Sequence, residues 1–194
     1  MVGGTSRGAV RLAAVGVAAV AVLAGCSSTV DGTATEQGQG SAPTSHDESI
    51  PLFNPCTDLS DEVLAGADLD PASKQVTVDR QDGPPSWWKI CDWDSTDGPY
   101  GVSIFSTRRT VEERRSNERS RFVRDVTIGT RAGVVTTNPD DPDELTCHVS
   151  IPAAQGMFEL GITWLYGEPQ PTADTPPCDL AVRHMEYFEP HLPA

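Results

Sequence analysis

Cysteine has the most reactive side chain in this sequence, and the number and spacing of the cysteines limit what they can do. The chain has five of them: Cys26 near the N-terminus, and then Cys56, Cys91, Cys147 and Cys178. Zinc ligands come in close pairs, and the absence of C-x-x-C and H-x₃₋₅-H spacings disfavours a metal site. A free catalytic cysteine would leave an odd number among the last four. An even set favours disulfide bonds in an oxidising compartment.

Four cysteines can pair in three ways. We favour sequential pairing, Cys56–Cys91 and Cys147–Cys178, because it closes two loops of similar size. On the chain-entropy model each loop contributes about 3–4 kcal/mol to the free energy of unfolding. That is a large share of the roughly 5–15 kcal/mol that separates a folded domain from its unfolded chain.

The N-terminal segment has the features of an export signal. Arg7 and Arg11 precede an uninterrupted run of apolar and glycine residues, 12–24. A helix of that length is roughly 20 Å long, which is shorter than the roughly 30 Å hydrocarbon core of a bilayer. A cleaved signal therefore fits the segment better than a transmembrane helix.

The signal ends in Leu23-Ala24-Gly25-Cys26, which resembles the lipobox of bacterial lipoproteins. In those proteins the cysteine thiol is acylated before cleavage leaves it as the first residue. The resemblance implies a signal peptide at 1–25 and lipidation of Cys26, with the membrane as a partner through the lipid. Two acyl chains would be enough for stable anchoring. The alternative is a free or disulfide-bonded Cys26 behind a conventional signal.

Residues 26–49 contain little that could form a core, since Ser, Thr, Gly, Gln and Pro dominate. They are predicted to form a flexible polar tether after the lipidated cysteine, with a reach of about 25–30 Å. Residues 50–194 have the length and composition of a single globular domain.

The chain is acidic, with a formal net charge of −14. Such a surface repels nucleic acid and anionic headgroups, so we expect no nucleic-acid partner. Basic residues nevertheless gather in the strip Arg108–Arg131, which contains eight arginines. The simpler interpretation is a solvated helix face, and the alternative is a strip that binds an anionic partner.

Trp87 and Trp88 are the side chains that we single out for ligand contact. Neighbouring residues of a strand point to opposite faces, so one of them is expected in the core and the other at the surface. An exposed tryptophan can contact a sugar, lipid or peptide. The simpler alternative is a structural role at the edge of the core beside Trp93.

Acidic side chains are the only candidates for hydrolytic chemistry, as a pair drawn from Asp92, Asp94 and Asp97. Asp97-Gly98 is better explained as a hairpin turn than as part of a calcium loop. The sequence has no G-x-S-x-G motif, phosphate loop or dinucleotide fingerprint. The four histidines are scattered, and His184 falls on the apolar stripe of the last helix, where a structural role is expected. We predict no catalytic residue, no metal and no cofactor.

Periodicity predicts the elements that position these residues. Alternating or β-branched runs predict strands at 75–79, 90–94, 101–107, 131–137, 145–151 and 157–166. Helices are predicted after Ser60, from the capping box Thr110-x-x-Glu113 to about Asp125, and after Pro176. The expected fold class is α+β, with a mostly antiparallel sheet of about five to six strands, two to three helices and two disulfides.

Several of these motifs together resemble a known family. They are the lipobox and tether, Asn54-Pro55-Cys56-Thr57-Asp58-Leu59, Cys91-Asp92-Trp93, and the later Cys147 and Cys178. This set resembles the actinobacterial, mycobacterial-type lipoproteins that carry a domain of unknown function, the 3558 family, over most of residues 50–190. The resemblance implies envelope location, two disulfides and an α+β fold, and it brings no activity with it.

The function expected from the sequence is that of a non-enzymatic cell-envelope lipoprotein on the outer face of the cytoplasmic membrane. Its domain would bind an unidentified envelope ligand or protein. The alternatives are an envelope hydrolase that uses its acidic residues and a structural accessory of an envelope complex.

Overall fold

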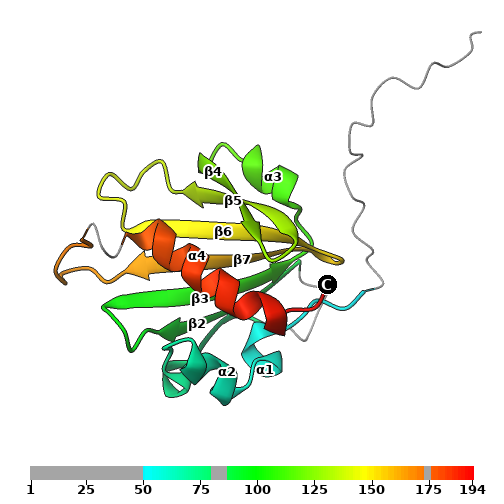
Figure 1. Cartoon of the computed structure of the whole chain (residues 1–194), viewed down its shortest axis with the longest axis horizontal. Helices are drawn as coiled ribbons and strands as arrows, with labels where there is room; N and C mark the ends of the chain where they lie inside the picture. Colours follow the sequence, from blue (N-terminus) through cyan, green and yellow to red (C-terminus); the bar gives the residue numbers. More distant parts are fainter. Residues whose placement is uncertain (1–49, 80–86, 173–175) are drawn as a thin grey trace, which may run out of the picture. The chain divides into compact units, whose positions relative to one another are not determined.

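Seven strands of the described residues form one antiparallel sheet (Figure 1). The computed structural model describes residues 50–79, 87–172 and 176–194, so the predicted signal peptide, Cys26 and the tether lie outside the described residues. The strand order is β1-β2-β3-β7-β6-β5-β4. The strands are β1 Gln75–Val78, β2 Trp88–Asp94, β3 Tyr100–Thr107, β4 Arg121–Ile128, β5 Arg131–Thr137, β6 Thr146–Ala153 and β7 Gly156–Trp164.

Helices lie on both faces of this sheet. The α-helices are α1 Pro55–Asp58, α2 Asp61–Gly66, α3 Val111–Arg115 and α4 Pro177–Phe188, and the 3₁₀ turns are η1 Pro71–Ser73 and η2 Glu189–His191. Helix α4 packs along β6 and β7, and α1 packs against β2 and β3 (Figure 1). Helix α3 packs instead against β5 and β6 on the opposite face. No helix of the described segments is long and apolar enough to cross a membrane.

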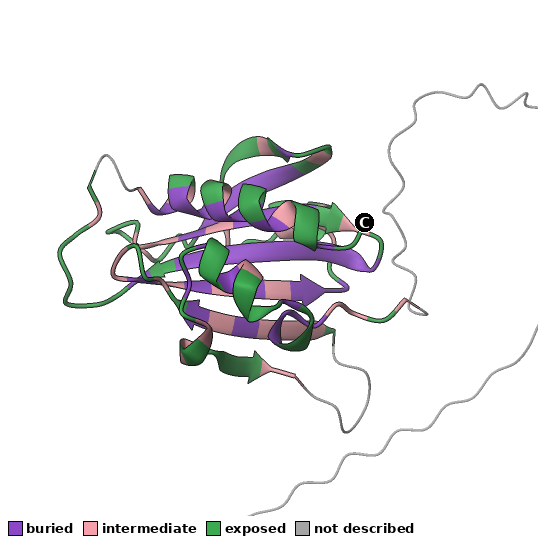
Figure 2. Ribbon diagram, turned by 60° about the horizontal axis from the view of Figure 1, so that its bottom comes forward, coloured by how far each residue is buried: buried purple, intermediate pink, exposed green. Residues whose placement is uncertain are grey.

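The core lies between the sheet and α1, α2 and α4. Along β7 the alternate residues Phe158, Leu160 and Ile162 are buried in it, because every second side chain of a strand points to the same face. Helix α4 supplies Leu180 and Phe188 to the same core. Figure 2 shows this pattern as buried stretches on the central strands and on the inner side of α4.

Both disulfides join a helix to the sheet across this core. Cys56 of α1 bonds to Cys91 of β2, and Cys147 of β6 bonds to Cys178 of α4. These are the sequential pairs, with separations of 35 and 31 residues. Each crosslink therefore fixes a covering helix on the strand beneath it.

The expected sheet of five to six strands with two to three helices is wrong. The additional strand is β4, in a region that we predicted as helix up to about Asp125. The capping box of Thr110 and Glu113 does form, but helix α3 ends at Arg115. Strand β4 is an edge strand and is exposed along most of its length, so it carries charged residues that obscure its alternation. The short α1, capped by the Asn54 side chain, is the additional helix.

His184 lies in the core, as the sequence predicts. It is 3% exposed, and its Nε2 lies 3.1 Å from the hydroxyl of Tyr100. Burial, helped by the charge of Arg183, lowers the pKa of His184 from 6.5 to about 4. The folded protein therefore holds His184 in its neutral form at neutral pH.

We predict that His184 makes folding stability fall as the solution is acidified from about pH 6.5 to about pH 4. In this window the unfolded chain binds a proton at His184 that the folded chain excludes, and the loss amounts to about 3 kcal/mol. Thermal unfolding at a series of pH values should show a flatter pH dependence for His184→Gln than for the unmodified chain. The exposed His191 provides the control, because His191→Gln should leave the dependence unchanged. Parallel pH curves for His184→Gln and the unmodified chain would contradict the prediction.

Candidate functional site

The face of the sheet opposite α4 carries a row of side chains that crosses several strands. Ile90 of β2 is paired with Phe105 of β3, Phe105 with Glu159 of β7, and Glu159 with Ser150 of β6. The row changes from apolar to charged where it passes from β3 to β7. Glu159 is thus a carboxylate at the centre of a sheet, on its helix-poor face.

His148 lies next to this row on β6. It follows Cys147, and the alternation of the strand turns the cysteine into the core and the histidine to the other face. Its cross-strand partner is Gly161. A Cβ on Gly161 would come within 2.9 Å of the imidazole ring, so the glycine leaves the space that the ring occupies.

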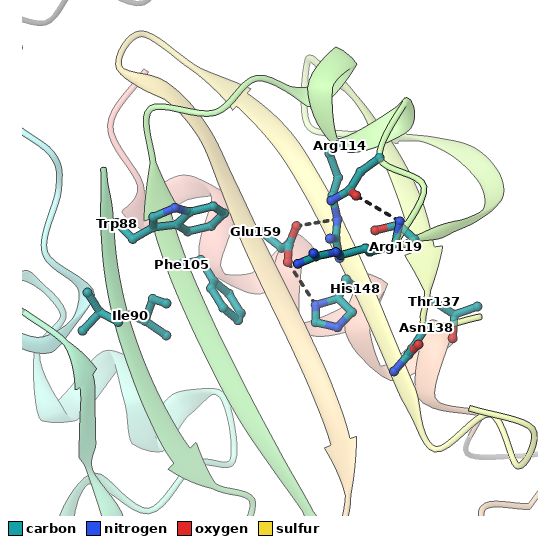
Figure 3. A pocket seen from close by; sticks show the side chains of 12 residues that line it. Trp88, Ile90, Phe105, Arg114, Arg119, Thr137, Asn138, His148 and Glu159 are labelled. Atoms are coloured by element: carbon teal, nitrogen blue, oxygen red, sulfur yellow. Dashed lines mark hydrogen bonds and ion pairs between the residues drawn. The ribbon is translucent and has the colours of Figure 1, made fainter. Parts of the chain in front are cut away.

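Helix α3 and the loop that follows it form a wall above this face. The capping box holds the first turn of α3, and Arg114 extends from the helix toward Glu159 (Figure 3). In the loop, the Oδ1 atom of Asn117 accepts a hydrogen bond from the backbone N–H of Arg119, and its backbone carbonyl accepts one from Ser120. These bonds fix the conformation of the loop.

Sheet and wall together border an open pocket of about 560 Å³, which we call the sheet-face pocket. It is lined by Val78, Trp88, Ile90, Phe105, Arg114, Asn117, Arg119, Ser120, Thr137, Asn138, His148 and Glu159. Figure 3 shows its apolar side chains on β2 and β3 and its charged and amide side chains on the other side. A second cavity of about 370 Å³ shares Trp88, Arg114 and Asn117 with it.

Glu159 is the charged centre of the pocket. Its Oε2 lies 2.9 Å from Nε of Arg114 and accepts a hydrogen bond from the Ser150 hydroxyl, and its Oε1 lies 3.1 Å from Nδ1 of His148. Burial alone would raise the pKa of this carboxyl. The adjacent His148, the charge of Arg114 and the Ser150 hydrogen bond outweigh burial and hold the pKa of Glu159 below its ordinary value. The carboxylate is therefore ionised at neutral pH.

A carboxylate at one ring nitrogen orients an imidazole and fixes which nitrogen carries the proton. The contact of Glu159 with Nδ1 holds the His148 ring beside the carboxylate. In the part of the chain that the structure describes, no Ser, Thr or Cys side chain is hydrogen-bonded to His148. Glu159 therefore holds charged and hydrogen-bonding side chains in fixed positions around the pocket.

The two tryptophans chosen from the sequence have different positions. Trp88 lines the pocket and meets Phe105 edge to face, with ring centroids 6.3 Å apart. Trp87 precedes β2 and is 41% exposed, and the guanidinium of Arg109 lies 5.0 Å from its ring centroid. Trp93 is on the core face of β2. Of the pair, Trp88 is therefore the residue that lines this pocket.

The three acids considered for hydrolysis are not gathered at the pocket. Asp92 is hydrogen-bonded to Ser103 and Thr77, Asp94 is exposed, and Asp97 pairs with Arg183 of α4. None of the three lines either of the two cavities described above. Among the described residues, no group of three or more His, Cys, Asp and Glu side chains is placed to hold a metal ion.

The basic strip Arg108–Arg131 is largely neutralised by partners. Six of its arginines form ion pairs with carboxylates; they are Arg109, Arg114, Arg115, Arg121, Arg124 and Arg131. Arg108 is buried and donates to the carbonyl of Ile50. The eighth, Arg119, lines the pocket. The strip is thus a set of separate ion pairs spread over α3, β4 and β5.

Sequence reasoning did not identify Glu159 or the grouping of Arg114 and His148 around it. A signal was present for Glu159, because it is the single charged residue in the apolar run of β7, Gly156–Trp164. A lone carboxylate in a buried strand requires partners. The identity of those partners depends on the register between β6 and β7 and on where α3 packs. Neither can be read from the sequence.

Comparison with known proteins identifies the family but no activity. The family described as "Protein of unknown function (DUF3558)" matches residues 21–191, and the chain belongs to this family. No curated protein and no solved structure matches the chain.

We predict that Glu159→Gln lowers the free energy of unfolding by about 2–4 kcal/mol, because it removes the charge that balances the Arg114 guanidinium while preserving side-chain shape. Urea unfolding at pH 7 measures the change. The control is Glu144→Gln, which breaks the exposed ion pair between Arg121 and Glu144 and should cost less than about 1 kcal/mol. Equal losses in the two variants would show that the Glu159 cluster contributes no more than a surface pair.

Proposed function

We propose that this chain is a non-enzymatic cell-envelope lipoprotein of the actinobacterial type that binds a small ligand in the sheet-face pocket. In this proposal acyl groups on Cys26 hold it on the outer face of the cytoplasmic membrane. The observation that carries the binding role is the pocket itself, with an apolar wall that includes Trp88 and a charged centre at Glu159.

The size and construction of the pocket support ligand binding. A volume of about 560 Å³ falls in the range of small-molecule sites, which are largely preformed and combine apolar walls with a few polar groups. The polar groups around Glu159 are already held by one another, so a ligand would meet an ordered surface. Less ordering on binding leaves more of the contact energy as affinity.

Export and lipidation are supported by the N-terminal sequence. The basic residues, the short apolar run and Leu23-Ala24-Gly25-Cys26 occur in the order that a lipoprotein signal requires. The family match starts at residue 21, so Cys26 lies inside the matched region. The acidic mature chain would be repelled by anionic headgroups, and acyl chains would supply the attraction that its charge does not.

We predict that Cys26→Ala abolishes membrane attachment. Expressed in an actinobacterial host, the unmodified chain should partition into the membrane fraction and carry a diacylglycerol mass at its mature N-terminus. Cys26→Ala should lose both properties, because the thiol that accepts the lipid is gone. Ser27→Ala is the matched control and should stay lipidated. An unmodified chain that is soluble, with a free Cys26 thiol, would contradict the proposed anchor.

We predict that a small-molecule extract of the host envelope contains a ligand that raises the melting temperature of the unmodified chain. A ligand at 100 times its Kd adds about 2.7 kcal/mol to the free energy of unfolding. Ser120→Trp places a large ring at the pocket wall and should abolish the increase. Glu186→Trp, on the exposed side of α4, introduces the same ring elsewhere and should preserve it. An equal increase in all three proteins would show that the ligand binds outside the pocket.

A further inference from the structure

The charges that line the sheet-face pocket do not cancel. Arg114 is paired with Glu159, which leaves Arg119 as a positive charge at the pocket wall. Arg119 has no ion-pair partner within residues 50–79, 87–172 and 176–194. Figure 3 shows its side chain extending from the α3–β4 loop over the sheet toward Glu159 and His148. In a chain with a net charge of −14, this is a local excess of positive charge.

The amide groups of Asn117 and Asn138, which line the same pocket, are also arranged as donors. Oδ1 of Asn117 accepts the backbone N–H of Arg119, and Oδ1 of Asn138 accepts that of Asp140. With both amide oxygens engaged by the backbone, the NH₂ groups are what these side chains have to offer a ligand. No hydrogen bond from either NH₂ group to another described residue is formed. Guanidinium and amide donors that line one pocket are the groups that bind an oxyanion.

The opposite wall is apolar. Trp88 and Phe105 meet edge to face, with an interplanar angle of 80°, and Ile90 and Val78 continue the surface. Trp88 stands on β2, and the charged groups stand on β6, β7, α3 and the loop after α3. A ligand that fills the pocket therefore touches hydrocarbon with one part and donors with another.

From these contacts we propose that the sheet-face pocket binds an amphipathic anion, with a single oxyanionic group against Arg119 and an aromatic or acyl body against Trp88 and Phe105. This inference rests on the proposed function, because it names the ligand class of the same pocket. Glu159 is not available to bind a cation, since Arg114, His148 and Ser150 already occupy its two oxygens.

A matched pair of fluorescent probes tests the anionic part of the ligand. The anion 1-anilinonaphthalene-8-sulfonate and the neutral N-phenyl-1-naphthylamine have the same ring system and differ in the sulfonate. They are titrated into the mature chain, residues 26–194, carrying Cys26→Ser so that no lipid competes. We expect one sulfonate site per chain, with a Kd at least about tenfold below that of the neutral probe, because charge-assisted hydrogen bonds favour the anion.

Variants assign the two parts of the probe to the two walls. Arg119→Gln should weaken sulfonate binding by about five- to tenfold and leave the neutral probe unchanged. Arg121→Gln is the matched control, because Arg121 is two residues away and paired with Glu144; it should change neither Kd. Trp88→Leu should weaken both probes. Circular dichroism and melting temperatures establish that each variant is folded.

The results separate this inference from the proposed function. If Trp88→Leu weakens both probes but Arg119→Gln changes neither, the pocket binds ligands and the anionic preference is overturned. If Trp88→Leu changes neither probe, the pocket is not the binding site and both proposals fail. Displacement of the bound sulfonate by 1-naphthoate or by dodecanoate supports the anionic class, and the stronger competitor identifies an aromatic or an acyl body. Failure of both carboxylates to displace it counts against that class.

Discussion

The buried carboxylate of Glu159 is the constraint on which the helix-poor face of this protein depends. A charge in the middle of a sheet is costly unless it is paired and hydrogen-bonded. Ser150 and His148 supply two contacts from the neighbouring strand, and Arg114 supplies the third from α3. The contact with Arg114 joins α3 and its loop to the sheet, and that loop is one wall of the pocket. The ion pair that compensates the charge of Glu159 therefore also positions one wall of the pocket.

The opposite face is stabilised by different means. There the sheet buries alternate apolar side chains under α1 and α4, and a disulfide fixes each of these helices to the strand below it. Cys147 and His148 show how close the disulfide-linked core lies to the polar pocket. They are neighbours on β6, yet one forms a crosslink in the core and the other lines the pocket. Both disulfides lie on the face covered by α1 and α4, and the polar side chains of the pocket lie on the other face.

Much of the fold could be predicted from local sequence patterns, and much of the site could not. Strands such as β5 and β7 are β-branched or aromatic runs, and the turn at Asp97-Gly98 marks the β2–β3 hairpin, so both were predictable. Strand β4 was not, because an edge strand is solvated and its charged residues resemble an exposed helix after a capping box. The Glu159 cluster was not predicted because its members are far apart in sequence. Only the pairing of β3 with β7 and of β6 with β7 brings the pocket together.

The strand order has a consequence for how the pocket comes into being. Strands β1 to β3 are hydrogen-bonded in sequence, as are β4 to β7, and the two sets meet at the β3–β7 pairing. Trp88 and Phe105 belong to the first set, whereas His148 and Glu159 belong to the second. Contacts between segments so distant along the chain form at a high cost in loop entropy. The pocket thus exists only after the two halves of the sheet have paired. A ligand that contacts both walls would stabilise the β3–β7 pairing that joins them.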